Sequence, residues 1–217
     1  MKSYKMISFI GLEQSDIPYY LACELEQKKL RVLVVDNSFS HDLFKSIKKA
    51  ETNTDYQECG RIVYIQNVAY SNDFFEKFDV VIIYHGYNVD EKLLETSDKI
   101  VVYTNYFKDT AEMFFNYIDV DWINENIPAE RTIMLFRDKL SNKIAEEYIQ
   151  HRIGITEISE EYVISFDEGN LINYFNFTYN GKQKRSGISG EMKSFIDVLK
   201  NFVLGKKNKK SKTEVIE

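Results

Sequence analysis

The sequence predicts one doubly wound α/β domain, built on a single, mainly parallel sheet of about seven strands with helices on both faces. Short apolar runs alternate along the chain with stretches of helical periodicity, which is the order that βαβ units require. Most of these runs are continuously apolar, as in strands that are covered on both faces. A length of 217 residues suits one domain of this class, which we assign to residues 1–204.

The expected elements follow from the two periodicities. Strands are expected at Lys5–Ile10, Arg31–Asp36, Arg61–Gln66, Asp79–Tyr84, Lys99–Thr104, Thr132–Phe136 and Tyr162–Phe166. Helices are expected at Ile17–Lys29, His41–Ala50, Asn72–Lys77, Lys108–Ile118, Asn142–His151 and Gly190–Leu204. Ligands of such sheets bind at the carboxyl ends of the strands, so the loops that follow the strands are the places to search for function.

Composition excludes several classes of protein. Hydrophobic residues make up 44% and charged residues 29% of the chain, which argues against wholesale disorder. A net charge of −6 is unsuited to a general polyanion binder. Cys23 and Cys59 form no close pair and give no zinc spacing, so reduced thiols in the cytoplasm are expected. No apolar run approaches the roughly 20 residues of a membrane span.

The last residues, 205–217, differ from the rest. Lysines collect there without any apolar periodicity, which predicts a disordered tail. The lysines are compatible with contact to an anionic membrane or to nucleic acid. A solvated tail is the simpler interpretation.

The order of motifs resembles the ParA/MinD-type P-loop ATPases, which carry a deviant Walker A motif. The segment ISFIGLEQSDIPYYLACELEQKKLRVLVVDNSFSHDLF follows that family's opening order of strand, loop, helix, basic turn and a second strand that ends in Asp36. FDVVIIYHG is similar to its Walker B strand, and SDKIVVYTNYFKDTAEMF and VISFDEGN are similar to later segments. RTIMLFRDKL lies where the family has the strand that ends near its adenine-contacting residue. The resemblance implies a P-loop NTPase-like fold across most of Met6–Leu204.

The loop after the first strand departs from that family. A P-loop needs several glycines, so that backbone N–H groups can turn to the phosphates, and a lysine to neutralise their charge. This loop has Gly11 alone, and neither Lys nor Arg occurs between Met6 and Gln27. Glu13 and Asp16 place carboxylates where a triphosphate would sit, and like charges oppose binding. Ser15 or Asp16 is instead expected to cap the following helix.

Of two later motif positions of that family, one keeps its acid and the other has lost it. The resemblance assigns Asp36 to the acid that orients the attacking water. It assigns Tyr84 to the place where the Walker B aspartate would hold magnesium-bound water. One carboxylate without lysine or magnesium cannot run phosphoryl transfer. Gly11, Glu13, Ser15, Asp16, Asp36 and Tyr84 are therefore interpreted as vestigial positions, and we expect no catalytic residue, cofactor or metal.

Two further groups have chemical interest. His85 follows a strand at the ligand edge, but the sequence names no partner for it, so a loop histidine without a catalytic role is the simpler interpretation. Asp36, Asp42, Glu13 and Asp16 could together hold a divalent cation. Separate helix caps are the simpler interpretation, because Asp and Ser are the favoured cap residues.

Three functions remain open on the sequence. The first is a non-catalytic scaffold or localisation factor on a ParA/MinD-like fold, with protein partners that include a second copy of the chain. The second is an active nucleotide-binding ATPase with an atypical loop. The third is a flavodoxin-like or receiver-like regulatory domain, and the order of the strands distinguishes it from the other two.

Overall fold

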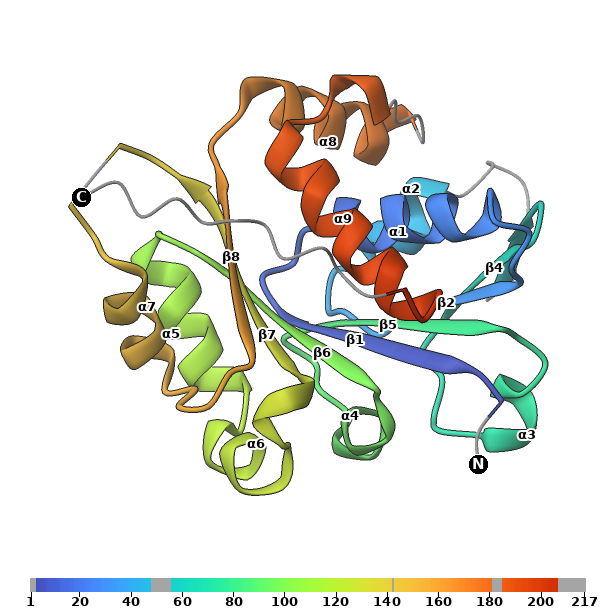
Figure 1. Ribbon diagram of the computed structural model, residues 1–217, viewed down its shortest axis with the longest axis horizontal. Coiled ribbons are helices and arrows are strands. Elements are labelled where there is room, and N and C mark those ends of the chain that lie inside the picture. The colour runs from blue at the N-terminus through green and yellow to red at the C-terminus, as the bar shows by residue number, and fades with distance from the viewer. Residues whose placement is uncertain (1–2, 48–55, 142, 181–184, 207–217) are drawn as a thin grey trace.

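The computed structural model describes residues 3–47, 56–141, 143–180 and 185–206. One sheet of eight strands runs through this part of the chain in the order β3-β4-β2-β5-β1-β6-β7-β8 (Figure 1). All neighbouring pairs are parallel except β3 and β4. The strands are β1 (Lys5–Gly11), β2 (Val32–Asp36), β3 (Tyr56–Cys59), β4 (Ile62–Gln66), β5 (Val80–Gly86), β6 (Lys99–Asn105), β7 (Thr132–Lys139) and β8 (Glu160–Ser165).

The predicted α/β class is confirmed, and each of the seven expected strands is present. The expected number of strands was one too low. The additional strand, β3, is short and largely exposed, and its polar residues Gln57 and Glu58 interrupt any apolar pattern. In the flavodoxin-like order, β1 pairs with β2. Here β5 separates β1 from β2, so the flavodoxin-like or receiver-like alternative is excluded.

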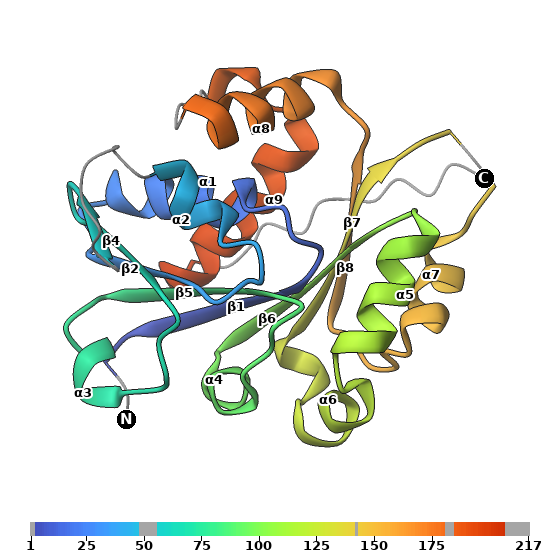
Figure 2. The same ribbon diagram turned by 180° about the vertical axis from the view of Figure 1, so that it is seen from behind.

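Helices cover both faces of the sheet (Figures 1 and 2). On one face lie α1 (Asp16–Glu26), α2 (Asp42–Ile47), α8 (Glu168–Asn180) and α9 (Gly190–Val203). On the other face lie α3 (Asn72–Phe75), α4 (Glu91–Thr96), α5 (Lys108–Tyr117), α6 (Val120–Asn126) and α7 (Glu146–Ile153). Two 3₁₀ turns, η1 (Ala129–Arg131) and η2 (Arg185–Gly187), complete the described elements.

The helices differ from the predicted set in three ways. The structure adds α4, α6 and α8, and α7 begins at Glu146 where the periodicity had suggested position 142. The predicted helix over 41–50 is observed as α2, and its last three residues lie outside the described part of the chain. The same holds for residues 207–217 of the predicted tail.

The hydrophobic core explains why β1 and β5 lie at the centre of the sheet. Every residue of β5 is buried, and so is every residue of β1 after Lys5. On one face, Ile7 and Phe9 pack beneath α1 and α9, whose Phe195 and Leu199 are also buried. Burying a side chain of this size stabilises the fold by roughly 1.5–3 kcal/mol. Among the described residues, no helix is long and apolar enough to cross a membrane.

Candidate functional site

The candidate site lies where the loops after β1 and β2 meet at the carboxyl edge of the sheet. Gly11 ends β1 with φ at +100°, a region that disfavours any side chain. A Cβ atom at this position would also overlap the carbonyl oxygen of Tyr103 and approach the Phe114 ring to 2.8 Å. Gly11 is thus required by the close passage of the loop over β6 and α5.

Glu13 joins the two loops. Its carboxylate oxygens accept hydrogen bonds from the backbone N–H groups of Phe39, at 3.0 Å, and Ser40, at 3.2 Å. The side chain also fills the space beside Gly86, because a Cβ atom there would lie 2.5 Å from a Glu13 carboxylate oxygen. Glu13 therefore bonds to donors of the protein's own backbone.

Ser15 and Asp42 make a second link between these loops. The Ser15 hydroxyl donates to Asp42 Oδ2 at 2.5 Å, and Tyr174 of α8 donates to the same oxygen at 3.3 Å. Burial raises the pKa of Asp42, although these hydrogen bonds oppose that shift. The prediction that Ser15 caps α1 is wrong, because its side chain makes no capping bond and is turned to Asp42.

Asp16 forms a buried ion pair that sequence reasoning did not find. Arg137, in β7, donates from Nη1 to Asp16 Oδ1 at 2.5 Å and to the Tyr103 hydroxyl at 2.5 Å. The Asp16 and Arg137 side chains are only 1% and 2% exposed. Asp16 Oδ1 also accepts the N–H of its neighbour Ile17, which is a local contact and no helix cap. The second oxygen, Oδ2, has no hydrogen-bond partner among the described residues.

Asp36 is buried at the end of β2, and its carboxylate is used by its own loop. Oδ1 accepts from the Ser38 hydroxyl at 2.6 Å and from the Ser38 N–H at 3.1 Å, while Oδ2 accepts from the Phe44 N–H at 2.9 Å. Burial raises the pKa of Asp36, and these hydrogen bonds act against that change. The carboxylate thereby fixes the turn into α2.

Tyr84 lies between Phe9 of β1 and Asp36 of β2 in the register of the sheet. Its side chain is fully buried in the core beneath α1 and α2. Its hydroxyl has no hydrogen-bond partner among the described residues. Burial raises the pKa of Tyr84 far above its usual value, so the hydroxyl stays neutral and cannot replace a metal-binding carboxylate.

His85 is a strand residue and not the loop residue that was expected. It points to the face opposite Tyr84, where its side chain is completely buried. Its Nε2 lies 3.2 Å from the Ser8 hydroxyl, and its Nδ1 accepts the N–H of Asp90 at 3.3 Å. Burial lowers the pKa of His85 to about 4. These contacts join β5 to β1 and to the loop after β5.

The acidic residues of the site do not converge on one point. No group of three or more His, Cys, Asp or Glu side chains in the described part of the chain is arranged to hold a metal ion. Glu13, Asp36 and Asp42 each bind separate donors of the protein. Their hydrogen bonds therefore hold the loop after β1 to the segment that follows β2.

Arg137 and Tyr174 are the residues that sequence reasoning missed. Arg137 follows the buried run TIMLF in a strand of the ligand edge, and that position was the one signal available for it. Nothing in the sequence connects it to Asp16, which lies 121 positions away. Tyr174 belongs to a helix that no periodicity had predicted.

Solved structures with the same architecture have a P-loop NTPase-like α/β fold. A ParA family ATPase from Chlorobium tepidum TLS superposes with a TM-score of 0.64 at 15% identity, covering 94% of this chain and 99% of that one. MinD in the MinC:MinD cell division complex of Aquifex aeolicus gives 0.64 at 9% identity, with 94% and 97% covered. A plasmid partition protein from Borrelia burgdorferi B31, bound to AMPPNP, gives 0.59 at 13% identity, with 93% and 99% covered.

These likenesses establish the fold that the sequence had suggested. No protein-family model matches the chain, and no curated protein matches it either. At such low identity, only the architecture carries over. Any activity has to be argued from the residues of the site.

Proposed function

We propose that this protein is a non-catalytic, ParA/MinD-like pseudo-ATPase that acts as a scaffold or as a localisation and assembly factor through protein–protein contacts. The observation that carries this proposal is the pair formed by Asp16 and Arg137. The Arg137 guanidinium, at the end of β7, could neutralise a phosphate group. Here the Asp16 carboxylate of the loop after β1 already neutralises the charge of Arg137.

The rest of the loop supports the same conclusion. Phosphate binding at a helix N-terminus needs backbone N–H groups that point at the ligand and an excess of positive charge. Glu13 accepts the backbone N–H groups of Phe39 and Ser40, and Asp16 accepts that of Ile17. A triphosphate would have to displace both carboxylates and overcome their negative charge. The loop is therefore best regarded as a remnant P-loop whose acids replace phosphate.

The metal position supports the absence of hydrolysis. Phosphoryl transfer in P-loop enzymes depends on a magnesium ion that bridges the phosphates. The neutral, buried hydroxyl of Tyr84 offers no ligand for that ion. The Asp36 carboxylate already accepts hydrogen bonds from the Ser38 hydroxyl and the Phe44 N–H. In this proposal, Gly11, Glu13, Ser15, Asp16, Asp36 and Tyr84 are vestigial positions that now stabilise the fold.

Protein partners are the remaining way for this fold to act. The Aquifex aeolicus neighbour was solved as a complex of MinD with MinC, so the architecture supports partner binding in that protein. For this chain we propose a protein partner, with a homodimer as one form, and a cytoplasmic location. The free thiols of Cys23 and Cys59 are consistent with a reducing compartment.

A melting experiment tests the proposal. A ligand that binds only the folded state stabilises it by RT ln(1 + [L]/Kd), which is about 2.7 kcal/mol at a hundredfold excess over Kd. We expect no change in melting temperature with ATP, ADP or GTP up to millimolar concentration, with or without magnesium. An active ParA family ATPase measured in parallel serves as the positive control. A saturable, magnesium-dependent shift would instead support the alternative of an active ATPase with an atypical loop.

A further inference from the structure

Helix α8 is apolar on two opposite sides. Its inner side packs on α1, where Phe177 is fully buried and the centre of its ring lies 4.4 Å from that of Tyr19. Its outer side carries Ile172, Phe175 and Tyr179, which are 50%, 50% and 84% exposed and which we call the outer stripe. Figures 1 and 2 show α8 at the margin of the molecule. The inner side accounts for the fold, and the outer stripe is left for another contact.

The outer stripe has the spacing of a seam between two paired helices. Its members lie three and then four positions apart, so they fall on one face of α8. The same alternation of three and four brings the facing side chains of two helices together at a crossing angle of about 20°. A further step of four positions towards the N-terminus reaches Glu168, the only charged residue in the sequence of α8. The outer side of α8 is therefore suited to meet a second helix.

The charges of the chain favour a second copy as the partner. The net charge is −6, so two copies repel each other least where the surface between them is uncharged. After Glu168, α8 contains no Asp, Glu, Lys or Arg. A lipid surface is a poorer match, because helices that lie on membranes carry Lys and Arg on their polar face. Contact between two α8 helices brings no like charges together along most of their length.

The position of Glu168 selects the orientation of the two helices. In a parallel pair, the two Glu168 carboxylates would face and repel each other. In an antiparallel pair, Glu168 faces Tyr179 of the second copy, whose hydroxyl is a hydrogen-bond donor for the carboxylate. The same register places Ile172 opposite Phe175 of the second copy. Each contact then occurs twice, related by a two-fold axis that passes between Ile172 and Phe175.

We propose that two copies of this chain associate through the outer stripes of their α8 helices, packed antiparallel about a two-fold axis. This dimer gives a surface to the homodimer named in the proposed function, and it rests on that function in this respect. It uses the side of α8 that faces away from the loop after β1. A monomer would therefore overturn the α8 dimer and leave the expected insensitivity to nucleotides untouched.

The exposed area suits a reversible dimer. An aromatic side chain covers about 150–250 Å² when it is fully buried. At their observed exposures, Phe175 and Tyr179 would together bury roughly 200–330 Å² more from each copy. A standard interface buries about 800 Å² per partner, with an apolar centre and a polar rim. The two aromatic side chains supply roughly a third of that area, so we expect dissociation in the micromolar range.

Sedimentation velocity of the full chain, from low to several hundred micromolar, tests the dimer. We expect an equilibrium between monomer and dimer that depends on concentration. Phe175→Glu should weaken it by at least about tenfold, because a carboxylate would then face the apolar Ile172. A wild-type chain that stays monomeric throughout this range would overturn the proposal and leave the outer stripe to a different protein or to a lipid surface.

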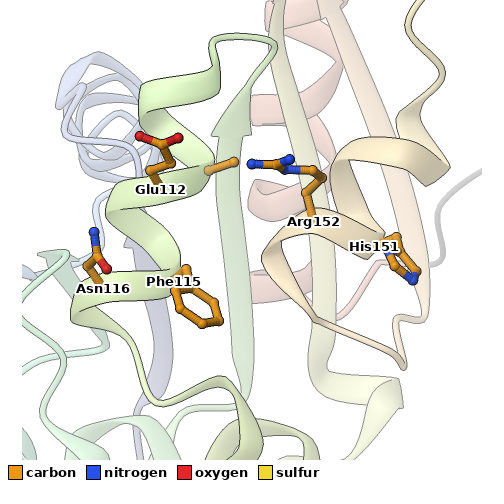
Figure 3. Close-up of a pocket in the computed structure, with 6 residues that line it drawn as sticks. Glu112, Phe115, Asn116, His151 and Arg152 are labelled. Atoms are coloured by element: carbon orange, nitrogen blue, oxygen red, sulfur yellow. The ribbon is translucent and has the colours of Figure 1, made fainter.

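Phe115→Glu is the matched control. Phe115 is 75% exposed on α5, where it lines a groove together with Glu112 and Arg152 on the opposite face of the sheet (Figure 3). The control makes the same change of charge and size away from α8, so the dissociation constant should stay unchanged. Thermal melts confirm that both variants are folded. An equal loss of association in the two variants would contradict a contact through α8.

A mixture of two variants tests the antiparallel register. Ile172→Lys should dimerise as poorly as Phe175→Glu when each is measured alone. An equimolar mixture should recover association, because position 172 of one copy faces position 175 of the other and opposite charges then meet. In a parallel pair, position 172 would face position 172, and mixing would bring no recovery. Failure of the mixture to associate better than either variant would therefore overturn the antiparallel pairing.

Discussion

Arg137 reaches across β6 to hold Asp16, which lies 121 positions earlier in the chain, and it touches the hydroxyl of Tyr103 of β6 on the way. The contact depends on strand order, since β6 lies between β1 and β7 in the sheet. Both partners are almost completely buried. The pair therefore joins the loop after β1 to the end of β7.

Breaking this pair should be costly. Arg137→Met leaves the Asp16 carboxylate buried without a counter-charge, which typically costs about 3–5 kcal/mol of unfolding free energy. The double variant, Arg137→Met with Asp16→Asn, should recover part of that loss because it removes both charges. Urea denaturation measures the midpoints.

The exposed pair of Lys108 and Glu112 is the control for this experiment. Lys108→Ala should cost less than about 1 kcal/mol, because exposed pairs are weak. If Arg137→Met were equally mild, the ion pair would not be the element that holds the loop.

The second prediction concerns Gly11. Gly11→Ala combines a positive φ with overlap against β6, so we expect a loss of more than about 2 kcal/mol of unfolding free energy. Gly190→Ala is the matched control, since a Cβ atom there meets nothing within 4 Å and alanine favours the first turn of α9. Thermal melts of both variants measure the difference. A Gly11→Ala protein as stable as the control would show that the loop can move away from Tyr103.

The strands could be predicted from the sequence because each buried parallel strand is a continuous apolar run. Val32–Asp36 and Val80–Gly86 are examples, and both are buried throughout. α8 escaped prediction for a related reason. It buries Phe177 but exposes Ile172 and Tyr179, so apolar residues occur on both sides and no amphipathic period results.

The residues of the site could be located, but their partners could not. Glu13, Ser15, Asp16, Asp36 and Tyr84 all lie at the carboxyl edge, which the rule for parallel sheets indicates. Which donor each carboxylate binds depends on distances across loops and strands. The pairing of Asp16 with Arg137 also requires the position of β7 beside β6, and one sequence does not provide that.

The third prediction uses the buried histidine. Burial lowers the pKa of His85 to about 4, against 6.5 for an unfolded chain. Between these values the unfolded state binds more protons, so stability from this group is complete above pH 6.5 and is lost as the pH falls towards 4. The contribution of His85 to the unfolding free energy that is lost in this way is up to about 3 kcal/mol.

His85→Asn should therefore flatten the fall in unfolding free energy between pH 6.5 and 4, measured by urea titrations at each pH. His151→Asn, at an exposed position, should leave the wild-type slope unchanged. Two variants with the same slope as the wild type would show that another group causes the acid sensitivity.

The last prediction concerns whether a glycine-rich, lysine-containing loop after β1 is enough to give ATP hydrolysis. Replacing residues 13–16 by a glycine-rich sequence with a lysine would remove the carboxylates of Glu13 and Asp16 and add the charge that phosphate needs. We expect no ATP hydrolysis above background from this variant, because Tyr84 still provides no ligand for magnesium at the end of β5. A phosphate-release assay with and without magnesium measures this, and a melt confirms that the variant is folded. A magnesium-dependent rate from the new loop alone would show that the position of Tyr84 is not what prevents catalysis, and the proposed loss of the metal site would have to be abandoned.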